Sequence, residues 1–167
     1  VGGHVVYKVS PQGQVLLTLG TKGQAGQITE PNDVVVARNG DVFIAQGHTP
    51  GANGDPRVVK FDRNGKFLKS WGGKGKGPGQ FEVAHGIAID EKGTVFVADR
   101  ENGRIQRFTM DGKYLGEWGS FGKTFSLTVR GAALYIGTQP RNEPNGSSGW
   151  LMKIDKSSGK VLGVVES

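Results

Sequence analysis

The stretch FEVAHGIAIDEKGTVFVADRENGRIQRFTMDGKYLGEWG, from Phe81 to Gly119, contains four short apolar runs separated by polar turns. The runs fall at 86–90, 94–98, 104–109 and 113–118, and each has the length of a β-strand. Asp111-Gly112, between the last two runs, is a hairpin signal because glycine accepts a positive φ. The stretch therefore predicts four consecutive strands joined by turns.

The same pattern recurs along the chain. Four turn glycines, Gly13, Gly65, Gly112 and Gly159, are separated by 52, 47 and 47 residues. Equivalent apolar runs are expected as strands at 33–37, 41–45, 57–62 and 66–71, and again at 126–129, 133–137, 150–155 and 160–165. Two earlier runs, 4–9 and 14–19, match only the third and fourth strands of a unit. A period near 50 residues with four strands per unit is typical of a β-propeller blade.

We therefore expect an all-β chain, a β-propeller with about three and a half four-stranded blades. The half blade spans residues 1–27, and the blades span 28–80, 81–123 and 124–167. Propellers close with about four to eight blades. The remaining blades are expected from the same longer chain, with a second copy of this chain as the alternative.

The composition of the 167 residues excludes several classes of protein. No apolar run approaches the roughly 18 residues of a membrane span, and the 29 glycines follow no Gly-X-Y register. The absence of cysteine excludes a disulfide scaffold, a cysteine nucleophile and a thiolate metal site. The 21 basic residues give a net charge of +6 but are scattered rather than clustered, which argues against a nucleic-acid partner.

Candidate functional residues lie in the connections that a propeller gathers on one face around its channel. His85 enters an innermost strand, where an imidazole is a candidate zinc ligand, and the alternative is a structural histidine. His48 is a candidate second ligand, base or surface residue on the same face. Arg100 is a candidate to bind an anionic group by a bidentate contact, and the alternative is an ion pair with Asp99 or Glu101.

With its units aligned, the sequence resembles NHL repeats, most clearly in HGIAIDEKGTVFVADRENGRIQRF at 85–108 and DGKYLGEWG at 111–119. It is also similar to one enzyme family, the peptidyl-α-hydroxyglycine α-amidating lyases and their bacterial homologues. That resemblance is carried by VADRENGRIQ from Val97, PNDVVV from Pro31 and GPGQFEVAHGIAI from Gly77. It covers nearly the whole chain and is weakest from Thr124 onward.

The resemblance implies a six-bladed NHL propeller that acts as a carbon–nitrogen lyase. Such an enzyme cleaves a peptidyl-α-hydroxyglycine to a peptide amide and glyoxylate, with zinc held by histidines in the channel and a structural calcium nearby. His85 falls at a zinc-ligand position, Ile87 at a position whose backbone carbonyl binds calcium, and Arg100 at the position of a catalytic arginine. The implied partner is a small-molecule or peptide-derived substrate, and the resemblance favours a secreted or periplasmic location.

One position departs from that family's pattern. In Gln46-Gly47-His48, the histidine stands where the family has a catalytic tyrosine, and the pKa values of the two side chains differ by several units. His48 is therefore expected to act as a base or as an additional ligand. The alternative function is a non-catalytic NHL propeller that binds a protein or another ligand. A calcium-dependent hydrolase of the lactonase type would need a convergent Glu, Asp and Asn set, which the sequence does not show.

Overall fold

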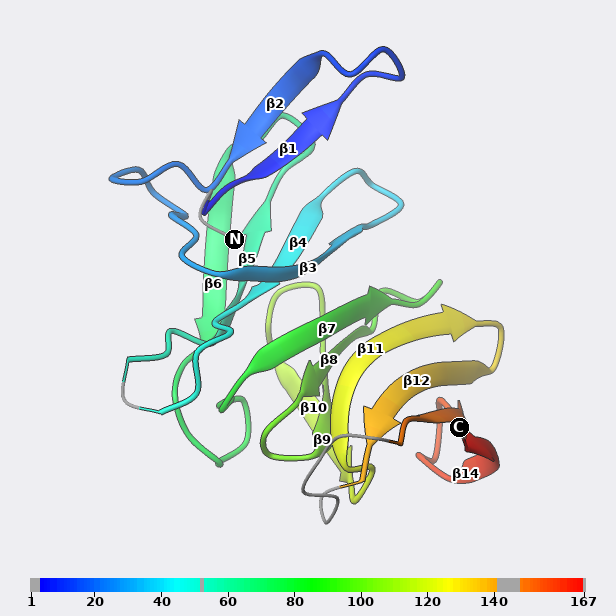
Figure 1. Cartoon of the computed structure of the whole chain (residues 1–167). Helices are drawn as coiled ribbons and strands as arrows, with labels where there is room; N and C mark the ends of the chain where they lie inside the picture. Colours follow the sequence, from blue (N-terminus) through cyan, green and yellow to red (C-terminus); the bar gives the residue numbers. More distant parts are fainter. Residues whose placement is uncertain (1–3, 52, 141–147, 167) are drawn as a thin grey trace.

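The computed structural model describes residues 4–51, 53–140 and 148–166. Within these ranges the chain forms fourteen β-strands and no helix, arranged as one two-stranded and three four-stranded antiparallel sheets (Figure 1). In each sheet the strands pair in chain order, as they do in a propeller blade. The expected fold class, an all-β partial propeller of about three and a half blades, is confirmed.

The strand bounds follow the repeat. The two-stranded sheet contains β1 (Val6–Val9) and β2 (Val15–Leu19). The four-stranded sheets are, in chain order, β3 (Pro31–Val36), β4 (Val42–Gln46), β5 (Arg57–Phe61) and β6 (Phe67–Gly72); β7 (Ala84–Ile89), β8 (Val95–Asp99), β9 (Arg104–Phe108) and β10 (Tyr114–Gly119); and β11 (Lys123–Arg130), β12 (Ala133–Gln139), β13 (Trp150–Asp155) and β14 (Val161–Glu166). All fourteen expected strands are present. The largest shift is the start of β11, three residues earlier than the apolar run indicated.

The core lies in layers between adjacent sheets. Phe43 and Phe108 belong to one buried cluster between the β3–β6 and β7–β10 sheets, and Phe96 and Ile136 belong to another between the β7–β10 and β11–β14 sheets. The middle strands β4, β5, β8 and β9 are almost wholly buried, because a neighbouring sheet covers each of their faces. The fourth strands β6 and β10 are largely exposed. The residues of β4 and β8 form continuous apolar runs because both faces of these strands are buried.

Most of the hairpin turns share one geometry. Their glycine donates its N–H to the carbonyl three residues earlier, as Gly65 does to Asp62 and Gly112 to Thr109, whereas Gly159 donates to Asp155, four residues earlier. A side-chain oxygen of the residue that opens the turn also accepts backbone N–H groups two and four residues later. The openers with this contact are Ser10, Asp62, Asp90 and Thr109. These are three-residue hairpin loops closed by a glycine with positive φ.

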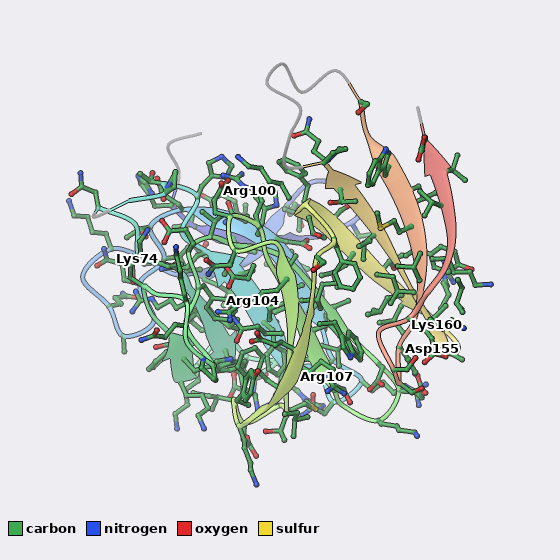
Figure 2. All side chains as sticks on the ribbon, turned by 90° about the horizontal axis from the view of Figure 1, so that it is seen from below. Lys74, Arg100, Arg104, Arg107, Asp155 and Lys160 are labelled. Carbon is green, nitrogen blue, oxygen red and sulfur yellow. The ribbon has the colours of Figure 1, made fainter. Side chains whose placement is uncertain are left out.

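The strand ends define two faces of the molecule. We call the end with the hairpin turns at 10–14, 37–41, 62–66, 90–94, 109–113, 130–133 and 155–160 the turn face, and the end with the connections at 46–57, 72–84, 99–104 and 119–123 the loop face. Figure 2 shows Arg100 toward the loop face and Arg107 and Asp155 toward the turn face. The first strands of the three four-stranded sheets lie side by side, with β7 between β3 and β11 (Figure 1). No helix in the described ranges is long and apolar enough to cross a membrane.

Candidate functional site

His85 lies near the start of β7, at the loop face, and its side chain is half-buried. Its Nδ1 is 2.7 Å from the backbone carbonyl oxygen of Phe125, which belongs to the next sheet. A carbonyl oxygen only accepts, so Nδ1 carries the hydrogen and donates it. The lone pair of the neutral ring is therefore on Nε2, the arrangement found in metal-binding histidines.

A close approach of two strands makes this hydrogen bond. A Cβ atom at Gly86 would lie 3.0 Å from the same Phe125 oxygen and 3.3 Å from the Cα of Ser126. A larger residue would push β11 away from β7. Glycine at this position lets the Phe125 carbonyl reach the neighbouring His85 ring.

His48 follows β4, is exposed, and lies against His85 with 5.4 Å between the ring centroids. Its Nδ1 is 3.0 Å from the Oδ1 of Asn32, and the Nδ2 of Asn32 donates to the carbonyl of Ala84 at 2.8 Å. Because Nδ2 is the donor to Ala84, Oδ1 is the acceptor from His48. The second imidazole therefore also donates through Nδ1 and keeps its lone pair on Nε2.

The connection that carries His48 is held at several points. Glu30 accepts hydrogen bonds from the backbone N–H and the hydroxyl of Thr49, and these bonds hold the pKa of Glu30 below its usual value. The buried Gln46 accepts a hydrogen bond from the N–H of Thr29 and donates one to the carboxylate of Asp55. It therefore links the connection between β4 and β5 to the segment that precedes β3. The position of His48 is thus set by its neighbours in the chain and by Asn32.

Arg100 is 9% exposed and meets the same aromatic ring as His85. Its guanidinium lies over Phe125, 5.5 Å from the ring centroid, and the His85 ring meets Phe125 edge-on at 5.5 Å. The Nε of Arg100 donates to Glu101 at 2.9 Å, so the expected ion pair is present. Its terminal nitrogens have no acceptor among the described residues, which leaves them for an anionic group.

The electrostatics favour a neutral His85. Burial lowers the pKa of His85 most, the hydrogen bond to Phe125 raises it, and the nearby positive charge of Arg100 lowers it again. Metals bind the neutral imidazole. The surroundings of His85 therefore support the protonation state that a ligand needs.

Ile87 is buried two residues beyond His85, and its N–H donates to the Oδ2 of Asp33 at 2.9 Å. No contact of its carbonyl oxygen distinguishes a calcium ligand from ordinary strand pairing with Val97. The assignment of this carbonyl to calcium stays a prediction.

The donor types around His85 fit zinc. Imidazole nitrogens are ordinary zinc ligands, and each of the two rings has the acceptor behind Nδ1 that such ligands usually have. Among residues 4–51, 53–140 and 148–166, no group of three or more His, Cys, Asp or Glu side chains could hold a metal ion. The described part of the chain thus offers two imidazole donors at this place.

A buried polar network organises the neighbouring connections. The carboxylate of Asp99, which is fully buried, is 2.8 Å from the Nε of Arg104. The same carboxylate accepts the N–H of Glu82, and Arg104 donates to the carbonyls of Gly77 and Gln80. The glycine-rich connection between β6 and β7 is therefore fixed by side chains of β8 and β9. Sequence patterning does not indicate this network, because its contacts join residues as far as 27 positions apart.

A groove of about 1010 Å³ opens on the loop face beside this network. Glu101, the partner of Arg100, contributes to its wall, but neither histidine does. Apolar walls come from Pro50 and Trp150, and polar walls from Glu82 and Arg104. The groove thus adjoins the Arg100 side of the site rather than the histidine pair.

Residues 81–108 match the NHL repeat family, as the sequence resemblance predicted. Peptidyl-glycine alpha-amidating monooxygenase of Mus musculus is 38% identical over 115 residues, which cover 62% of this chain and 11% of that protein. NHL repeat-containing protein 3 of Homo sapiens is 37% identical over 110 residues, covering 62% of this chain and 31% of that protein. A Caenorhabditis elegans protein named as a peptidyl-alpha-hydroxyglycine alpha-amidating lyase is 34% identical over 114 residues, covering 64% and 31%.

Two solved structures share the fold. Streptogramin B lyase superposes with a TM-score of 0.64 at 19% identity, covering 98% of this chain and 47% of that one. A chain of a nidogen/laminin complex superposes with a TM-score of 0.66 at 14% identity, covering 92% and 51%. At these identities the likeness shows the propeller fold alone. The chain spans between about a tenth and a third of the length of the relatives named above.

Proposed function

We propose that this chain is part of a zinc-dependent carbon–nitrogen lyase that cleaves a peptidyl-α-hydroxyglycine or a closely related α-hydroxy amide. The observation that carries the proposal is the grouping around Phe125. His85, whose neutral ring has its lone pair on Nε2, contacts this residue, and so does Arg100, whose terminal nitrogens have no acceptor within 4–51, 53–140 and 148–166. The grouping lies in a chain 34–38% identical to proteins named as amidating enzymes.

The reaction requires few groups. The hydroxyl on the α-carbon loses its proton, and its oxygen becomes the aldehyde oxygen of glyoxylate as the carbon–nitrogen bond breaks. The electron pair of that bond goes to the nitrogen, which takes up a proton and leaves as the peptide amide. The barrier falls if the site stabilises negative charge on the hydroxyl oxygen and binds the carboxylate.

The residues of this chain have matching roles. His85 would be one of the ligands that hold zinc, and the chemistry that zinc supplies is polarisation of the hydroxyl oxygen. Arg100 would bind the carboxylate of the substrate through its terminal nitrogens, while Glu101 and the Phe125 ring keep the guanidinium in place. His48, at the position of the family's tyrosine, is either a base for the hydroxyl proton or a further ligand.

The proposal also assigns roles to the Ile87 carbonyl and to the groove beside Glu101. The backbone carbonyl of Ile87 would bind a structural calcium, as the resemblance implies. The groove beside Glu101 offers room for the part of a peptide substrate that precedes the cleaved bond. A small-molecule or peptide-derived substrate is thus the expected partner.

The test is cleavage of α-hydroxyhippurate by the full chain with zinc, followed by release of glyoxylate. We expect activity that requires the metal, and a fall in kcat of about 100-fold or more in Arg100→Ala, as for removal of a charge-stabilising donor elsewhere. Arg130→Ala, an exposed arginine at the other end of β11, is the matched control and should leave kcat unchanged. No cleavage, together with no loss of metal in His85→Ala, would overturn the proposal.

A non-catalytic NHL propeller is the second candidate. It is favoured by the 37% identity to NHL repeat-containing protein 3, which lies within the range of 34–38% for the amidating proteins. In that case the loop face would bind a protein or another ligand without turnover. Metal bound at His85 combined with no glyoxylate release would favour this candidate.

A further inference from the structure

We propose that His48 is a metal ligand together with His85, and that Asn32 holds it in place for this role. The inference rests on the proposed assignment of His85 as a ligand. It departs from the catalytic tyrosine that the family resemblance places at position 48. Its evidence is the contact between the two histidines and the hydrogen bonds behind each ring.

The hydrogen bonds behind the two rings fix the tautomer of each histidine. Both Nδ1 atoms face pure acceptors, the carbonyl of Phe125 and the amide oxygen of Asn32. Both rings therefore present Nε2 as the basic nitrogen, on the side away from those acceptors. The hydrogen bonds thus fix the same tautomer in both rings, an arrangement that prepares each Nε2 as a metal donor.

The distance between the two rings also fits a shared metal ion. Two imidazoles bound through Nε2 to one tetrahedral zinc, with Zn–N distances of about 2.0–2.1 Å, have ring centroids about 5 Å apart. The centroids of His48 and His85 are 5.4 Å apart and their planes are inclined by 54°. The observed centroid distance is therefore close to that of two rings bound to one ion, and both Nδ1 atoms are held by acceptors.

Asn32 links the two histidines. It lies on β3 and connects the His48 ring to the carbonyl of Ala84, the residue before His85. One amide thus fixes the tautomer of the first ring and ties it to the strand of the second. Hydrogen-bond partners behind a ligand typically contribute about 10–100-fold to metal affinity.

The assignment has a chemical consequence. Nε2 cannot bind a metal and accept a proton at once, and Nδ1 already carries a hydrogen that it donates to Asn32. While a metal is bound, His48 is therefore excluded as the base for the hydroxyl proton. Of the two roles that the sequence leaves open for His48, base and metal ligand, this geometry favours the ligand.

The experiment is titration of the metal-free full chain with Co²⁺, followed by its visible absorption, and with Zn²⁺ by calorimetry. We expect one site, and at least a tenfold loss of affinity in both His48→Ala and His85→Ala. Asn32→Ala should lose about 10–100-fold. His4→Ala removes the third histidine of the chain, which is exposed, and should bind as the unchanged chain does.

A second measurement requires no substitution. In a long-range ¹H–¹⁵N correlation spectrum, Zn²⁺ should shift the Nε2 signals of both His48 and His85 and leave those of His4 in place. Unchanged affinity in a folded His48→Ala variant, or an unshifted Nε2 of His48, would overturn the inference. The proposed function fails separately, because metal binding by both histidines without glyoxylate release would contradict the lyase and not the metal pair.

Discussion

The turn face and the loop face are built from the same strands but held in different ways. On the turn face, each turn closes with contacts among residues at most about five apart, such as the bonds that Asp62 accepts from Asn64 and Lys66. On the loop face, the connection between β6 and β7 is held by residues more than twenty positions away, such as Arg104 and Gln106. Local contacts therefore close the turns of the turn face, whereas contacts between distant strands hold this connection of the loop face.

The difference explains where a candidate site can form. Most turns of the turn face close with the same local hydrogen bonds, as those at Gly65 and Gly112 do. The loop face has connections of different lengths. Asn32 of β3 bonds to Ala84 of β7, and the Phe125 carbonyl of β11 bonds to His85, so side chains of adjacent sheets lie against one another. Non-equivalent contacts between sheets bring His48, His85 and Arg100 together. The following predictions test this difference between the faces.

The largest effect is expected on the loop face. Asp99→Ala removes the buried carboxylate that Arg104 and the Glu82 N–H contact, and leaves a buried guanidinium without its nearest partner. Breaking a buried ion pair in this way costs about 3–5 kcal/mol. Chemical denaturation should show this loss in the free energy of unfolding.

The matched control is an aspartate of the turn face. The side chain of Asp111 is 83% exposed and lies 3.6 Å from Lys60. Asp111→Ala should cost no more than about 1 kcal/mol, as for exposed pairs. Equal losses in the two variants would contradict the contrast between the faces.

An intermediate effect is expected where turn glycines meet the preceding sheet. Gly112 has φ +79°, and a Cβ there would lie 2.7 Å from the Trp71 ring, whereas Gly13 has φ +81° and open space around it. Alanine at either position costs about 1–2 kcal/mol for the left-handed backbone. Gly112→Ala should cost a further 1–3 kcal/mol or so, because the indole must move.

Thermal unfolding of the two variants measures this difference directly, because the backbone cost is common to both. A melting temperature of Gly112→Ala clearly below that of Gly13→Ala would support packing of the turn against Trp71. The same melting temperature for both would show that the turn face depends on local geometry alone.

The smallest effect concerns Glu30, which anchors the connection carrying His48. Hydrogen bonds from Thr49 lower the pKa of Glu30, so this contact stabilises the fold above the unfolded-state pKa of about 4.5 and is lost as pH falls through the lower folded value. The amide proton shift of Thr49 should therefore titrate with a midpoint below pH 4.5. Glu30→Gln should abolish that transition, and a midpoint at or above 4.5 would contradict the assignment.

Much of the fold could be predicted because its signals are local. The run at 94–98 and the turn at Asp111-Gly112 required only apolar patterning and a glycine with positive φ, and the structure has β8 at Val95–Asp99 and φ +79° at Gly112. The early start of β11 was missed because Lys123, Thr124 and Phe125 do not form an apolar run. That segment is also where the family resemblance is weakest.

The site could be predicted only in part. His48, His85 and Arg100 were found, and the structure places the two histidines together and Arg100 across Phe125 from His85. Asn32 was missed, although it lies within PNDVVV, since no sequence rule indicates that an amide will face a residue sixteen positions later. The acceptor for His85 is a backbone carbonyl, which any residue type supplies, so side-chain chemistry could not identify it.

The separation of the two faces also has a practical use for anyone handling this molecule. Gln12 is exposed in the turn between β1 and β2, whose closure depends on the hydroxyl of Ser10 rather than on the glutamine side chain. A fluorophore, a spin label or a surface tether attached there would report on the propeller, or immobilise it, while the far end of the strands stays open to solution. Metal and substrate could then be supplied to an immobilised chain without the anchor competing for them.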